Sequence, residues 1–166
     1  MRGVNVGGVR ILMAELRALL AETGFSSVTT VLASGNVLFD LDEGDPHEAE
    51  RRMEQAVGER FGYRARILVL PVDELREAAA AYPHPRAEGK HAYLIFAEDS
   101  ATAEAVAAEA PSSNEDLIAV RGSVVYWEVA KGRTLDSPFG AALAKRKGAF
   151  LTTRNLQTIE KILKAA

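Results

Sequence analysis

The feature that most constrains this fold is the alternation of strand-length apolar runs with longer stretches of helical periodicity. Strand-like runs cover residues 4–6, 28–33, 37–39 and 67–70, and helical patterns begin near residues 13 and 46. The first part of the chain therefore has the order β-α-β-β-α-β, which is the order of elements in ferredoxin-like folds.

The second part of the chain repeats this pattern without repeating its residues. Strands are predicted over residues 92–97, 117–120 and 124–129, and helices over 71–81, 101–109, 136–147 and 156–163. The predicted fold class is α+β, with two ferredoxin-like βαββα(β)-type halves plus C-terminal helices. This class fits an apolar content of 48%, which is enough to build a core.

The Pro-rich polar segment 82–90 is the best linker in the chain. It predicts an N-terminal ferredoxin-like α+β subdomain over residues 1–82 and a C-terminal α+β subdomain over residues 83–166. The sequence leaves open whether the final helix packs back on the N-terminal half.

Local residue patterns predict how two elements begin and turn. Asp45 followed by Pro46 and Glu48 is a helix start, with a capping side chain, a proline at the first position and an acid in the first turn. Gly35-Asn36 is predicted to be a two-residue hairpin turn in which Gly35 has a positive φ.

Trp127 is predicted to lie in the core. It alternates with Val125 and Val129, so the three side chains share one face of a strand.

The composition excludes several classes of function. Because there is no cysteine, disulfides, thiol nucleophiles and thiolate metal sites are absent. A net charge of -3 gives no general attraction to nucleic acid, so nucleic-acid binding is not expected. No apolar run approaches the roughly 20 residues of a membrane span, and no signal-peptide pattern opens the chain. We expect a cytoplasmic protein that does not enter the membrane.

The acidic and histidine residues do not form a recognisable metal site. The acidic stretch 40–45 fails as a calcium loop, since Gly44 takes a ligand position and Arg51 stands where a bidentate acid is needed. His47, His84 and His91 have no metal-binding spacing, and no Ser-His-Asp grouping is visible. We therefore predict no metal and no cofactor, and the sequence leaves open whether the protein is an enzyme.

Three short polar motifs lie at the ends of predicted elements, where functional turns often sit. They are residues 2–8 (Arg-Gly-Val-Asn-Val-Gly-Gly), 33–36 (Ala-Ser-Gly-Asn) and 152–155 (Thr-Thr-Arg-Asn). Taken alone, the first two are better explained by tight turns than by a ligand site. The third is predicted to open the last helix, where an arginine is unfavourable unless it faces an anion or a carboxylate. It is the best candidate for an anion site.

In this order and spacing, residues 2–8, 13–17, 34–37 and 152–155 resemble the bacterial domain-of-unknown-function family 1697. The resemblance implies an α+β fold with ferredoxin-like elements, and no established activity, substrate or cofactor. Family members usually carry apolar residues ahead of the Arg-Gly pair. The sequence therefore leaves open whether the first strand is short or begins upstream of Met1.

We hypothesise that the protein binds a small anionic ligand, phosphate-like or nucleotide-like, in a cleft formed by the first and last motifs. Arginines would pair with the anion, and amides and hydroxyls would orient it. The predicted ligand-binding residues are Arg2, Asn5, Gly7, Gly8, Ser34, Asn36, Thr152, Thr153, Arg154 and Asn155.

The alternative is a protein-interaction module or homo-oligomer in which the motifs are purely structural and bind no ligand. Self-association would then use an exposed sheet edge. The sequence does not determine the oligomeric state.

Overall fold

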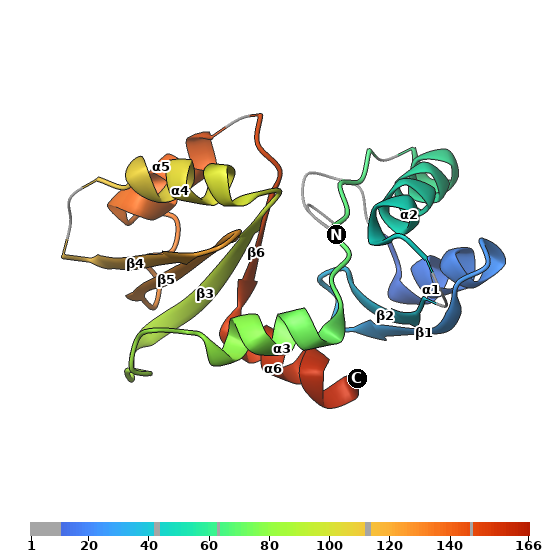
Figure 1. Ribbon diagram of the computed structural model, residues 1–166, viewed down its shortest axis with the longest axis horizontal. Helices are drawn as coiled ribbons and strands as arrows, with labels where there is room; N and C mark the ends of the chain where they lie inside the picture. Colours follow the sequence, from blue (N-terminus) through green and yellow to red (C-terminus); the bar gives the residue numbers. More distant parts are fainter. Residues whose placement is uncertain (1–10, 42–43, 63, 112–113, 147) are drawn as a thin grey trace. The chain divides into compact units, whose positions relative to one another are not determined.

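A computed structural model describes residues 11–41, 44–62, 64–111, 114–146 and 148–166 (Figure 1). Over these residues the protein is α+β, with six helices and two antiparallel sheets. The chain divides into two compact units. The first unit ends at Val72 and includes Lys161–Ala166, and the second is Asp73–Glu160, so the segment 82–90 lies inside the second unit. No described helix has the length and apolar character that a membrane span requires.

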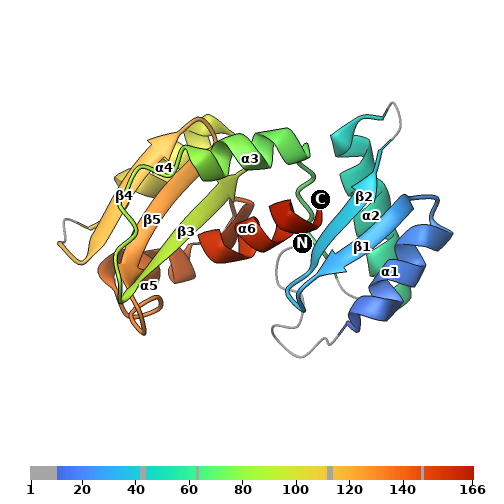
Figure 2. The same ribbon diagram turned by 90° about the horizontal axis from the view of Figure 1, so that it is seen from below.

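The first unit places two helices beside a two-stranded antiparallel sheet (Figure 2). Its elements are α1 (Met13–Glu22), β1 (Ser26–Val31), β2 (Asn36–Asp40) and α2 (Pro46–Phe61). The core of this unit is built from the apolar faces of both helices and from the segment that follows α2. Its buried side chains include Ile11, Leu16, Leu20, Phe25, Met53, Val57 and Ile67.

Helix α2 begins where the sequence predicts. The Asp45 side chain accepts a hydrogen bond from the His47 N–H at 3.0 Å, and Pro46 is the first helical residue. Gly62 ends the helix with a φ of +61°, a conformation that glycine adopts without steric cost.

The turn between β1 and β2 is longer than predicted. It contains four residues, 32–35, and Asn36 is already the first residue of β2, paired with Val31. Gly35 does have a positive φ of +72°, but Leu32 shares the left-handed region at +61°. The prediction of a two-residue turn was therefore wrong, whereas the positive φ predicted for Gly35 is confirmed.

Residues 67–70 are not a strand in the described part of the chain, contrary to the sequence prediction. Instead, two carboxylates one turn apart on α2 accept hydrogen bonds from backbone N–H groups of this segment. Glu54 accepts from the Ile67 N–H and Glu50 from the Val69 N–H, both at 2.8 Å. Because donors at alternate residues point the same way, one helix face satisfies both. The strand predicted over residues 4–6 lies outside the described residues.

The second unit is a four-stranded antiparallel sheet with the strand order β4-β5-β3-β6. Helix α3 (Val72–Ala80) leads into it. From β3 to β6 the elements follow the order β-α-β-β-α-β, and α6 continues directly from β6. They are β3 (Lys90–Ala97), α4 (Ser100–Ala108), β4 (Asp116–Arg121), β5 (Val124–Ala130), α5 (Pro138–Lys145), β6 (Leu151–Asn155) and α6 (Leu156–Ala165). The ferredoxin-like description of the two halves stays a prediction.

One face of this sheet packs under α4 and α5 (Figure 1). Val125, Trp127 and Val129 of β5 point into this core, and Trp127 is 1% exposed, which confirms its predicted burial. The ring of Trp127 stacks on Tyr93 and meets Phe139 of α5 edge-on. The intervening β5 residues Tyr126 and Glu128 lie on the opposite face, because side chains alternate along a strand.

The segment 152–155 does not open a helix as predicted. It is the body of β6, which pairs with β3 from Phe96 opposite Thr152 to Tyr93 opposite Asn155. Two β-branched threonines favour this extended conformation. Only Asn155 has the predicted capping role: its Oδ1 accepts from the Gln157 N–H at 2.9 Å.

Candidate functional site

Three strand ends and a helix start meet at one edge of the second unit. Because β3 is antiparallel to β5 and β6, both neighbours end near its start: Lys90 pairs with Ala130 at the end of β5, and Tyr93 pairs with Asn155 at the end of β6. Helix α6 begins directly after β6 and so starts at the same edge. A pocket of about 270 Å³ opens there. It is lined by residues 86–88, 90–92, 128, 131 and 155–157, all within the second unit.

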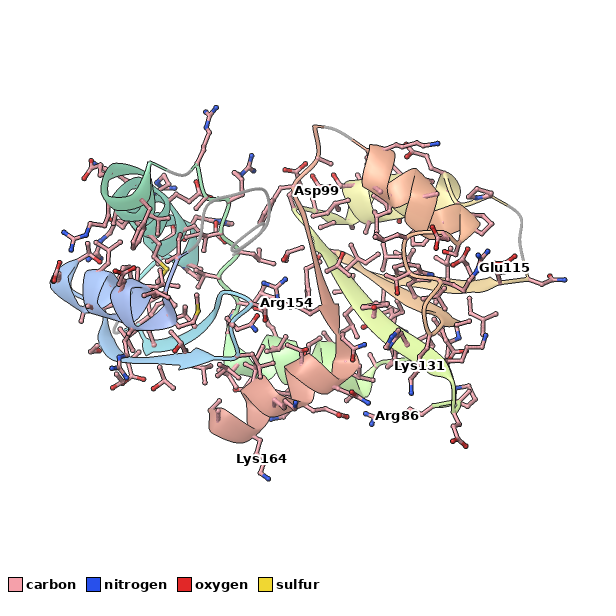
Figure 3. All side chains as sticks on the ribbon, turned by 180° about the vertical axis from the view of Figure 1, so that it is seen from behind. Arg86, Asp99, Glu115, Lys131, Arg154 and Lys164 are labelled. Carbon is pink, nitrogen blue, oxygen red and sulfur yellow. The ribbon has the colours of Figure 1, made fainter. Side chains whose placement is uncertain are left out.

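Three cationic side chains reach this pocket from three separate segments. Arg86 precedes β3, Lys90 begins β3 and Lys131 follows β5. Figure 3 shows Arg86 and Lys131 at the same end of the sheet. Arg86 forms an ion pair with Glu160, and this hydrogen bond raises the pKa of the guanidinium. The Lys131 ammonium forms no ion pair within the residues that the structure describes, so it is the cation most available to an anion.

A buried carboxylate also lines the pocket. Glu128 is 4% exposed, and its one ion-pair partner among the described residues is the Lys90 ammonium at 3.9 Å. That distance exceeds a normal hydrogen bond. Tyr82 lies close enough to respond to this charge. Burial first, and the Glu128 charge second, raise the pKa of the Tyr82 phenol to about 12.

A short hydrogen-bonded chain joins β3 to the start of α6. Asn155 Oδ1 accepts from the backbone N–H of Gln157, so its amide nitrogen is the atom that faces His91. Asn155 Nδ2 lies 3.4 Å from His91 Nδ1. If Nδ1 accepts this contact, the neutral imidazole carries its proton on Nε2. Asn155 thus contacts both the His91 ring and the backbone of Gln157 at the pocket.

The predicted site residues of the first unit stabilise their own turn. Asn36 is buried, and its amide donates to the Val31 carbonyl at 3.0 Å and to Ser34 Oγ at 2.9 Å. These bonds span the four-residue turn. The predicted residues Arg2, Asn5, Gly7 and Gly8 lie outside the described residues.

The predicted residues of the last motif divide between two faces of β6. Alternation puts Thr152 and Arg154 on one face, and Thr153 and Asn155 on the other. The Arg154 guanidinium donates to Thr152 Oγ1 and to the Thr153 carbonyl, both at 2.9 Å, and burial lowers its pKa. Arg154 therefore lies in a strand, two residues before α6 begins, and not inside the helix. Of the four residues, Asn155 lines the pocket.

Sequence reasoning missed the charged residues of this pocket. Arg86 and Lys90 belong to a segment that was predicted to be a linker, and Glu128 and Lys131 sit around a strand end. A signal was present in the sequence. Glu128 interrupts an apolar run in β5, and a charged residue in a central strand needs a polar partner.

The fold of this chain is that of a solved bacterial protein. The structure described as that of the conserved bacterial protein SP0830 from Streptococcus pneumoniae matches with a TM-score of 0.81 at 20% sequence identity. The match covers 99% of this chain and 93% of that one. At this identity the likeness shows the fold alone.

The sequence, unlike the fold, assigns the chain to a family. The model of the family DUF1697, described as a protein of unknown function, matches residues 1–126. The chain belongs to this family, as the motifs indicated. A comparison with curated proteins gives no match.

Proposed function

We propose that this protein binds a small anionic ligand, phosphate-like or nucleotide-like, in the pocket at the start of β3. The observation that carries the proposal is the convergence of Arg86, Lys90 and Lys131 on one cavity. Cations that come from separate segments to one concave site are typical of anion recognition. The cysteine-free composition supports the cytoplasm as the place where it acts.

The balance of charge makes Lys131 the main anchor of the anion. Arg86 and Lys90 are partly neutralised by Glu160 and Glu128, and Glu88 adds a second negative charge to the pocket lining. Lys131 has no such partner among the described residues. Leu156 and Gln157, in the first turn of α6, line the same pocket, and the positive end of the helix dipole there would also favour an anion.

The C-terminal motif contributes Asn155 to this proposal. A contribution from the N-terminal motif, residues 2–8, stays a prediction.

The alternative is a protein-interaction module or homo-oligomer whose motifs are purely structural. Its support is that Asn36 and Arg154 bond to atoms of their own motifs. This alternative predicts that no small anion binds.

Isothermal titration calorimetry separates the two proposals. Inorganic phosphate, a nucleoside monophosphate and a sugar phosphate are titrated into wild type, Lys131→Gln and Lys164→Gln. Lys164 is an exposed lysine in the last turn of α6, outside the pocket, and is the matched control. We expect the first substitution to weaken binding about tenfold, because a charge-assisted contact is lost, and the second to change it little. The absence of binding by every anion, or equal affinities for all three proteins, would contradict the anion site.

A further inference from the structure

The Glu128 side chain lines the pocket and is only 4% exposed, and its carboxylate accepts no hydrogen bond from any residue that the structure describes. Its contact with Lys90 at 3.9 Å supplies charge but not a short hydrogen bond. A buried carboxylate is costly unless donors surround it, so a group that enters this pocket meets a strong acceptor.

The size of the pocket adds a second constraint. A volume of about 270 Å³ corresponds to about nine water molecules at roughly 30 Å³ each. Inorganic phosphate would fill only part of it. The pocket therefore has room for an organic body beside the anionic group of a ligand.

We propose that the ligand is a hydroxylated phosphate ester, the class that includes sugar phosphates and nucleoside monophosphates. This inference rests on the proposed function. The phosphate would meet Lys131 and the start of α6, and a hydroxyl of the organic body would donate to Glu128. The pocket holds both kinds of group, cations for the phosphate and an acceptor for the hydroxyl.

Lys90 favours a hydroxyl over an ammonium as the donor to Glu128. Its own ammonium already lies 3.9 Å from that carboxylate. The Lys90 charge would offset part of the attraction of a second ammonium to the same oxygen atoms, whereas a neutral hydroxyl donates to them without that repulsion.

Calorimetry with matched esters tests this class. Ribose 5-phosphate is compared with propyl phosphate, which has the same anionic group and no hydroxyls, and with phosphoethanolamine. We expect ribose 5-phosphate to bind wild type at least tenfold more tightly than either. In Glu128→Gln that advantage should fall below about threefold, because a neutral amide is the weaker acceptor. The control Glu115→Gln, at an exposed carboxylate away from the pocket, should retain it.

Each outcome has one meaning. Equal affinities of ribose 5-phosphate and propyl phosphate for wild type would overturn this inference and leave the anion site standing. Tightest binding by phosphoethanolamine would overturn it as well. If no phosphate compound binds wild type, the proposed function itself fails. Melting curves of Glu128→Gln show whether the variant is folded, and the wild-type comparison decides the question even if it is not.

Discussion

Asp116 Oδ1 accepts a hydrogen bond from the indole Nε1 of Trp127 at 2.7 Å, and both side chains are buried. The second oxygen, Oδ2, accepts from the backbone N–H of Phe139 at 3.0 Å. One carboxylate on β4 therefore ties the central tryptophan of β5 to the first turn of α5. The same helix start is capped by Ser137, whose Oγ accepts from the Gly140 N–H.

Asp116→Ala should lower the free energy of unfolding by about 3 kcal/mol. It leaves the indole and Phe139 donors buried without an acceptor, and each such loss costs about 1–3 kcal/mol. Urea denaturation measures the change. The control is Glu115→Ala at the neighbouring exposed ion pair with Arg133, which should cost no more than about 0.5 kcal/mol. A loss below about 1 kcal/mol for Asp116→Ala would show that the bridge contributes little.

Gly140→Ala should destabilise the protein, although the same change usually stabilises a helix. An added Cβ would lie 1.9 Å from the Thr134 carbonyl oxygen, which is a backbone atom and does not move freely. We expect a loss of at least about 2 kcal/mol from this overpacking. The ordinary effect inside a helix is a gain of about 1 kcal/mol. Thermal and urea unfolding give the sign, and a gain would contradict the close approach.

Tyr82 and Tyr126 should respond differently to loss of their hydroxyls. The Tyr126 O–H donates to the Ala78 carbonyl at 3.1 Å, whereas the buried Tyr82 oxygen has no hydrogen-bond partner among the described residues. Tyr126→Phe should therefore cost about 1 kcal/mol at neutral pH. Tyr82→Phe should be neutral within about 0.5 kcal/mol or stabilising, because it removes an unsatisfied polar atom. A larger loss of unfolding free energy in Tyr82→Phe than in Tyr126→Phe would show that the Tyr82 hydroxyl does form a stabilising hydrogen bond.

Tyr82 should also shape stability at alkaline pH. Its folded-state pKa is raised to about 12 from an ordinary value of 10. Above pH 10 the phenol ionises in the unfolded chain but stays protonated in the folded one, so stability falls as the pH rises from about 10 to 12. Urea midpoints measured across this range should decline less steeply in Tyr82→Phe. Identical pH profiles for wild type and variant would show that Tyr82 titrates normally.

The two α2 carboxylates should control the segment that follows the helix. Glu54→Ala removes the acceptor of the Ile67 N–H and should cost about 1–3 kcal/mol. Hydrogen exchange at the Ile67 amide should accelerate more than exchange in α1. Glu59→Ala removes only an exposed contact with Gln55 and serves as the control. Unchanged exchange at Ile67 would mean that this amide is protected by something other than Glu54.

Local side-chain patterns were sufficient to predict the start of α2 and the core tryptophan. The cap of α2, Asp45, and its first residue, Pro46, are neighbours in the sequence. Trp127 is placed by strict alternation along β5. Helix caps and strand alternation depend on residues that are close in the sequence, so they can be recognised from the sequence alone.

The errors occurred where two physical roles suit the same residues. Thr and Asn cap helices, but Thr152 and Thr153 are also β-branched, and pairing with β3 makes them an edge strand. Residues 67–70 have strand-like composition, yet Glu50 and Glu54 of α2 supply their acceptors. In both cases residues distant in the sequence determine the conformation of the segment, and a local sequence pattern carries no information about those residues.

The candidate pocket was beyond sequence reasoning for a similar reason. Arg86 and Lys131 are separated by more than forty positions, and Asn155 follows later still. Only the antiparallel pairing of β3 with β5 and β6 brings these residues to one edge. Asn155 was identified as a site residue because it belongs to a polar motif, whereas the lysines looked like ordinary surface charges.

The most direct test of the anion site is a two-dimensional ¹H–¹⁵N NMR titration with inorganic phosphate and with ribose 5-phosphate, which shows where each ligand binds as well as whether it binds. We expect the largest saturable shifts at the backbone amides of Lys131, Asn155 and Gln157, which surround the pocket. These shifts should weaken in Lys131→Gln and persist in Lys164→Gln. Saturable shifts centred on Ser34 and Asn36, or no saturable shifts with either compound, would contradict an anion site at the start of β3.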